Sequence, residues 1–164
     1  MNLTFASLRI YRMMKKIIFL LLLCATHVLF AQTDETRKNN FNLKRNLALE
    51  GYDPVSYFSN KPIEGESKWV VNFKGVTYQF SNESNLAMFK ANPEKYEPAY
   101  GGWCAYAMGE SGEKVKIDPE TFKIIDGQLY LFYNFWGNNT LVNWNKNEKT
   151  LRAKAEQNWK KALH

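Results

Sequence analysis

Two short runs rich in aromatic and β-branched residues constrain the fold of this chain more than any other feature. The first run covers residues 68–73, the second covers residues 76–80, and Lys74 and Gly75 break the pattern between them. Such residues suit the pleated, half-buried surface of a strand, and a glycine break between two such runs is typical of a tight turn. The pattern therefore predicts a β-hairpin.

A helix is expected directly after this hairpin. The side chain of Ser81 or Asn82 can accept a hydrogen bond from the free backbone N–H groups at the start of a helix. Leu86 and Phe89 lie three residues apart and give the segment an apolar face. The residue before Pro93 avoids the helical region of backbone space, so the helix should end there.

The second half of the chain repeats the hairpin pattern and then becomes helical. Residues 122–125 and 128–133 flank Asp126-Gly127, a favoured two-residue hairpin turn. From residue 138 to residue 163 apolar side chains recur at helical spacing, with a break at 145–147. We therefore expect an α+β fold with a small antiparallel sheet built from two β-hairpins, short helices and a helical C-terminus.

The N-terminal segment has the order of a secretory signal peptide. Lys15 and Lys16 precede an apolar run over residues 17–23, and Ala31 offers a small-residue cleavage site. The run is short for a membrane span, which needs ~20 apolar residues. We expect residues 1–31 to be a signal peptide and the protein to be exported, either to a periplasm or out of the cell. A retained N-terminal anchor is the alternative.

Three further expectations concern the leader and the polar segment after it. Cys24 is a candidate for lipidation, although Leu23 stands where a lipobox has a small residue. Residues 32–46 are polar and aperiodic and predict a tether, so the domain should cover residues 47–164. Removal of residues 1–31 would lower the net charge from +6 to +2, because the segment holds four basic residues and no acidic ones. That near-neutral charge argues against nucleic acid as a partner.

Four stretches of the chain carry a resemblance to a known family. They are residues 51–58 (GYDPVSYF), 71–83 (VNFKGVTYQFSNE), 89–96 (FKANPEKY) and 101–106 (GGWCAY). The second and third stretches look like the YHS domain, and the first and fourth resemble the exported members of that family. The resemblance covers about residues 47–133.

The resemblance implies a treble-clef-like core and a metal-binding role, with a copper ion as the implied ligand. The chain departs from the family at the metal ligands. Many members carry a Cys pair where the hairpin meets the helix, but residues 80–85 contain no Cys. The family's histidine also has no counterpart, because the sequence has His only at positions 27 and 164. The fold can be carried over from the family, and the usual ligand set cannot.

Cys104 is the first candidate for chemistry. It is the only cysteine outside the leader, and a lone Cys in an exported chain is typical of a reactive thiol, an intermolecular disulfide or a soft-metal ligand. Met108 could add a thioether ligand for Cu(I), which prefers sulfur. Asp53, in the turn before Pro54, is a third candidate metal ligand. The alternatives are a buried apolar thiol for Cys104 and a turn-forming role for Asp53.

Aromatic residues near these candidates could line a pocket beside Cys104. They are Tyr57, Tyr100, Trp103 and Tyr106, and packing in the core is the alternative for them. Several other chemistries are excluded. A structural zinc site needs four good ligands, a Ser or Cys nucleophile of the triad type needs a His base, and a phosphate loop needs a Gly-Lys-Ser/Thr motif; the chain offers none of these.

Together these features favour an exported, non-enzymatic YHS-type binding module for a copper-like metal ion or a small ligand. Two alternatives stay open. One is a structural or interaction module that kept the fold and lost the metal, and the other is a thiol-dependent enzyme. Contact with a membrane is expected only through an uncleaved leader or a lipidated Cys24.

Overall fold

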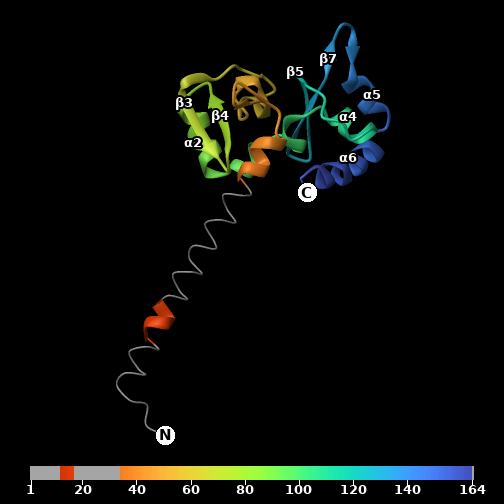
Figure 1. Ribbon diagram of the computed structural model, residues 1–164. Coiled ribbons are helices and arrows are strands. Elements are labelled where there is room, and N and C mark those ends of the chain that lie inside the picture. Colours follow the sequence, from red (N-terminus) through yellow and green to blue (C-terminus); the bar gives the residue numbers. More distant parts are fainter. Residues whose placement is uncertain (1–11, 17–33, 164) are drawn as a thin grey trace. The chain divides into compact units, whose positions relative to one another are not determined.

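The structure is a computed structural model that describes residues 12–16 and 34–163 (Figure 1). The predicted apolar run, the cleavage site at Ala31, and Cys24 lie outside the described residues. Residues 12–16 are helical. Among the described residues, no helix combines the length and the apolar character that a membrane span requires. Residues from Thr36 onward form one compact unit, which contains the predicted site residues Asp53, Cys104 and Met108.

The first predicted hairpin and its helix are confirmed. Strand β3 (Glu66–Phe73) pairs antiparallel with β4 (Val76–Phe80), and helix α2 (Glu83–Ala91) follows. Asn82 caps α2, because its side chain accepts a hydrogen bond from the backbone N–H of Asn85 at 2.9 Å. Helix α2 ends before Pro93, and one further turn, α3 (Pro93–Tyr96), completes the segment.

Residues 36–46 of the segment expected to be a tether belong to the compact unit instead. Strand β1 (Leu43–Lys44) pairs with β2 (Leu47–Ala48), and β2 pairs in parallel with β4 to give the strand order β1-β2-β4-β3. Phe41 is buried and packs edge-on against Trp159, with 6.0 Å between the ring centroids. The few apolar side chains of this polar segment, such as Phe41, pack against the rest of the fold. The average composition of the segment is polar and therefore does not indicate this packing.

The second predicted hairpin is also confirmed, but the two hairpins do not share one sheet. Strands β5 (Asp118–Ile125) and β6 (Gln128–Phe132) form a separate two-stranded sheet, and β7 (Asn134–Phe135) pairs with β8 (Asn138–Asn139) in a third. Single parallel bridges join Pro98 and Cys104 to β6. The chain before α4 therefore lies along β6, and the expectation of one sheet shared by both hairpins was wrong.

The remaining elements are helical, which confirms the α+β class and the helical C-terminus. Helices α5 (Thr140–Lys146) and α6 (Glu148–Ala162) are separated at Asn147, within the predicted break. Helix α4 (Ala105–Glu110) packs on α6, and a Cβ on Gly109 would lie 2.5 Å from the carbonyl oxygen of Leu151. Three 3₁₀ turns complete the fold: η1 (Leu49–Gly51), η2 (Ser56–Ser59) and η3 (Ala99–Gly102).

Two clusters of buried side chains form the core. One lies under the first sheet and contains Tyr78, Phe80 and Phe89, and the other lies between α4, β6 and the C-terminal helices and contains Met108 and Trp144. Both are dense in aromatic rings, whose tilted and edge-to-face contacts stabilise the core beyond the area that they bury.

Candidate functional site

Asp53 is fully buried, and protein donors occupy both of its carboxylate oxygens. Oδ1 accepts hydrogen bonds from the backbone N–H groups of Val55 (2.8 Å) and Ser56 (3.4 Å). Oδ2 accepts from the backbone N–H of Ser81 (2.9 Å), the Ser81 hydroxyl (2.7 Å) and the side-chain amide of Asn85 (2.6 Å). The carboxylate therefore joins the turn after η1 to the start of α2, as a structural group does.

Cys104 is also fully buried, immediately before α4. The Thr140 hydroxyl donates its only proton to the carbonyl oxygen of Tyr133 at 2.9 Å. The contact of 3.4 Å between Cys104 Sγ and Thr140 Oγ1 therefore uses the thiol S–H as the donor. Sγ in turn accepts a hydrogen bond from the Tyr133 backbone N–H at 3.3 Å. Both hydrogen-bonding contacts of the sulfur are therefore made within the protein.

A cavity of about 290 Å³ lies beside Cys104, and we call it the thiol cavity. Tyr106, Tyr133 and Thr140 contribute to its wall, together with Glu110. Of the four aromatic residues predicted to form a pocket here, Tyr106 is the one that lines this cavity. Met108 lies one helical turn after Cys104 but is buried in the second core cluster, beneath α6.

The other predicted pocket residues lie elsewhere. Tyr57 is buried in the first core cluster and donates a hydrogen bond from its hydroxyl to the Pro119 carbonyl at 2.9 Å. Trp103 donates from its indole N–H to the carbonyl of Asn40 at 2.6 Å. Tyr100 lines a different groove. Three of the four therefore do not contribute to the wall of the thiol cavity.

A copper site built from Cys104, Met108 and Asp53 does not fit this arrangement. The partners of Asp53 lie on residues 55–56 and 81–85, whereas those of the Cys104 sulfur lie on residues 133 and 140. Within residues 12–16 and 34–163, His, Cys, Asp and Glu side chains nowhere gather in groups of three or more that could hold a metal ion. Binding of a metal by the two sulfurs stays a prediction, which titration can test.

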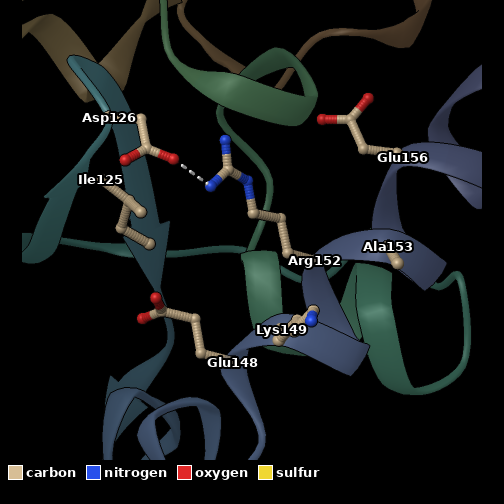
Figure 2. Close-up of a pocket in the computed structure, with 7 residues that line it drawn as sticks. All are labelled: Ile125, Asp126, Glu148, Lys149, Arg152, Ala153 and Glu156. Carbon is tan, nitrogen blue, oxygen red and sulfur yellow. Dashed lines mark hydrogen bonds and ion pairs between the residues drawn. The ribbon is translucent and has the colours of Figure 1, made fainter.

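A second hollow, which sequence reasoning missed, lies between the β5–β6 turn and α6 (Figure 2). Arg152 extends from α6 toward Asp126 of the turn, and its Nη1 donates a hydrogen bond to Asp126 Oδ2 at 2.6 Å. This bond raises the pKa of Arg152, so the guanidinium is charged throughout the physiological range. Figure 2 shows Glu156 on the opposite side of the guanidinium from Asp126.

This hollow adjoins another of about 440 Å³, and we call the two together the Tyr100 groove. The second part shares Asp126, Arg152 and Glu156 with the first and adds Tyr100 from η3, among others. Tyr130 also lines it, and the Arg152 guanidinium lies 5.7 Å from the Tyr130 ring centroid. Its walls therefore come from η3, the second hairpin and α6.

Tyr100 is the most unusual residue of this groove. It is only 3% exposed, and its hydroxyl has no hydrogen-bond partner in the described part of the chain. Its backbone is left-handed, with φ 54° and ψ 35°, a conformation that is rare for a bulky residue and costs about 1–3 kcal/mol. Burial raises the pKa of Tyr100, with further contributions from Tyr130 and Glu156, so the hydroxyl stays neutral.

Backbone contacts hold Tyr100 in this position. The carbonyl of Gly101 accepts a hydrogen bond from the backbone N–H of Asn42 at 2.9 Å, and the carbonyl of Gly102 accepts from the Asn42 side chain at 3.0 Å. Gly101 has φ +61°, and a Cβ there would lie 2.7 Å from Trp159 Cη2. The segment that was expected to be a tether therefore fixes the loop that carries Tyr100.

The sequence does hold a weak signal for this groove. Lys149, Arg152 and Glu156 recur at spacings of three and four, which places them on one face of a helix. By sequence alone, the basic residues of this segment indicate a solvated face or a surface for anionic lipid. Their proximity to Tyr100 depends on the packing of α6 against η3, which no local pattern predicts.

Comparison with known proteins adds no relative: no family model matches the chain, and no curated protein or solved structure matches it either.

Proposed function

We propose that this chain is an exported, non-enzymatic binding module that keeps a YHS-like scaffold without the metal site of that family. The observation that carries the proposal is the hydrogen bonding of Cys104. Its S–H is directed at Thr140 Oγ1, and its sulfur accepts the Tyr133 N–H. Cu(I) and electrophiles both react with a thiolate, so each would have to break this pair of contacts.

The environment of Asp53 supports the same proposal. The Asp53 carboxylate accepts hydrogen bonds from five protein donors, so it has no free lone pair for a metal ion. If the carboxylate turned toward a metal ion, buried N–H groups would lose their acceptor. The resemblance to the YHS domain is thus a proposal about the scaffold, and it does not extend to the ligands.

A thiol-dependent enzyme is the less favoured alternative. A catalytic cysteine needs a base or an electropositive environment that stabilises the thiolate. The sequence has His only at positions 27 and 164, and the charged side chains that line the thiol cavity are the carboxylates of Glu110 and Glu113. Within the part of the chain that the structure describes, the wall of the thiol cavity thus holds no cationic side chain that could pair with a thiolate, which argues against nucleophilic chemistry at Cys104.

Titration with Cu(I) in competition with a chromophoric chelator tests the proposal. Wild type, Cys104→Ser and Cys24→Ser should be compared, because Cys24 is the other thiol of the full chain. We expect the same Cu(I) affinity for wild type and Cys104→Ser. A tight site that is lost in Cys104→Ser and kept in Cys24→Ser would contradict the proposal and favour the metal-binding alternative.

Export is tested separately by the intact mass of the protein recovered from the compartment outside the inner membrane. A chain that begins at Gln32 is the expected product. A mass that corresponds to a diacylated N-terminal Cys24 would instead indicate a lipid anchor, and an unshortened chain would contradict cleavage.

A further inference from the structure

The Tyr100 hydroxyl lacks the partner that a buried polar group normally has. An unpaired hydroxyl in an apolar environment costs about 1–3 kcal/mol, and the left-handed backbone of the same residue adds to that cost. Strain and an unsatisfied group at one residue, held in place by hydrogen bonds from Asn42, are the features of a position prepared for a ligand. A ligand that binds here must bring a hydrogen-bond acceptor to Tyr100.

The charges of the groove restrict what that ligand can be. The part that Tyr100 lines also holds the carboxylates of Glu94, Glu97, Asp126 and Glu156. The first three are in ion pairs with Lys74, Arg37 and Arg152, so within the described residues Glu156 is left with an uncompensated negative charge, which disfavours an anion such as a phosphate. A cation is disfavoured at Tyr100 itself, because the positive charge of the Arg152 guanidinium already acts there, where it lowers the pKa of that hydroxyl against the larger effect of burial.

A neutral hydroxyl group satisfies both sides of the groove. Within the described residues, the Glu156 carboxylate has no hydrogen bond or ion pair with the protein, so it is a free acceptor. Tyr100 is a free donor. A ligand hydroxyl can accept a hydrogen bond from Tyr100 and donate one to Glu156. One hydroxyl, or two hydroxyls of the same ligand, would therefore give both side chains a partner without adding charge.

We infer that the Tyr100 groove binds a neutral polyhydroxylated ligand, a sugar ring, with Tyr100 and Glu156 as its polar contacts. The part of the groove that Tyr100 lines, at about 440 Å³, lies in the size range of small-molecule sites. The partly exposed ring of Trp159 supplies aromatic surface for the apolar edge of the sugar. This inference rests on the proposed function as a binding module and names the site and the ligand class.

Arg152 lines the same hollow as Tyr100. The hydroxyl is covered in the ligand-free chain, and Arg152 is held over the groove by the carboxylate of Asp126, whose side chain is 74% exposed. Exposed ion pairs contribute about 0–1 kcal/mol, so the guanidinium can move aside at small cost.

Two-dimensional amide NMR of the purified protein tests this inference, with methyl glucoside, methyl galactoside and N-acetylglucosamine as probes at millimolar concentration. We expect one of them to shift the backbone signals of Gly101 and Arg152. Tyr100→Phe and Glu156→Gln should each weaken that binding about tenfold, which corresponds to about 1.4 kcal/mol. Glu110→Gln, at the wall of the thiol cavity, is the matched control and should leave binding unchanged.

Three results would overturn the inference. The first is an absence of sugar-induced shifts at the groove, and the second is sugar binding that Tyr100→Phe leaves intact. The third is stronger binding there of inorganic phosphate or of spermidine than of any sugar. None of these results depends on Cu(I) affinity, so failure of this inference is distinguishable from failure of the proposed function.

Discussion

Asp53 and Tyr100 are both polar side chains with almost no exposure to solvent, at 0% and 3%, yet their hydrogen bonding is opposite. The carboxylate of Asp53 accepts five hydrogen bonds from two segments of the chain, residues 55–56 and 81–85. The hydroxyl of Tyr100 has no partner among the described residues. A buried polar group is expected to be paired, so the first residue follows the rule and the second is the exception.

The difference teaches which buried polar groups to associate with function. Asp53 stood out in the sequence as a candidate ligand, and its complete pairing gives it a structural role instead. Tyr100 also stood out, as a pocket residue, but the groove that it lines shares no residue with the thiol cavity beside Cys104. Unsatisfied bonding capacity is thus a better guide here than residue type.

The largest effect that would sharpen this comparison is expected for Asp53→Ala. It leaves the N–H groups of Ser81 and Val55 without their acceptor, and we expect a loss of about 3–5 kcal/mol in the free energy of unfolding. Asp118→Ala is the matched control, because Asp118 also precedes a proline and accepts hydrogen bonds from Glu120 and Thr121, but is only half-buried. Urea denaturation should show a loss of about 1 kcal/mol there. Equal losses would mean that Asp53 has no special role.

A smaller effect is expected at the loop that carries Tyr100. Gly101→Ala and Gly127→Ala both place a side chain at positive φ, +61° and +76°, which costs about 1 kcal/mol. At Gly101 the new Cβ also meets Trp159, whereas nothing lies within 4 Å at Gly127. We expect Gly101→Ala to lose about 1–3 kcal/mol more than Gly127→Ala in thermal or urea unfolding. An equal loss of unfolding free energy in both variants would show that Trp159 can move away from the new Cβ at little cost.

The change of the free energy of unfolding with pH in the alkaline range depends on buried tyrosines, both those with and those without a hydrogen-bond partner. Burial raises the pKa of Tyr57, Tyr78 and Tyr100, with Glu97 a further cause for Tyr78. The unfolded tyrosines ionise near pH 10 while the folded ones stay neutral, so stability is complete below about pH 10 and falls as the pH rises beyond it.

Each tyrosine contributes a slope of at most about 1.4 kcal/mol per pH unit. Urea denaturation at several pH values between about 8 and about 11 measures the slope. Tyr57→Phe and Tyr100→Phe should each make it shallower. A slope that neither variant changes would show that these hydroxyls are not buried as described.

The sequence predicts the local features of the fold well. Each hairpin and α2 depends on residues close in the chain, such as the Asn82 cap and the Asp126-Gly127 turn, so the local pattern is sufficient. The parallel pairing of Leu47 with Thr77 was not predicted, because side-chain periodicity identifies strands and does not choose their partners. The partition into three sheets was missed for the same reason.

The candidate site was less predictable than the fold. That Cys104 is buried follows from its residue type, and a buried thiol was among the alternatives. The Tyr100 groove combines η3, the second hairpin and α6, and its decisive feature is a missing hydrogen bond. Whether the Tyr100 hydroxyl has a partner depends on how segments distant in the sequence pack around it. No residue spacing in the sequence could therefore have indicated this feature.

The central claim, that Tyr100 is held without a partner until a ligand binds, is tested most directly by two Tyr-to-Phe variants in the absence of ligand. Tyr57→Phe removes the hydrogen bond to Pro119 and should lower the free energy of unfolding by about 1 kcal/mol. Tyr100→Phe removes a hydroxyl that has no hydrogen-bond partner within residues 12–16 and 34–163, so the stability of this variant should equal or exceed that of wild type. A loss at Tyr100→Phe as large as the loss at Tyr57→Phe would contradict the account, because the hydroxyl would then already have a partner in the ligand-free protein.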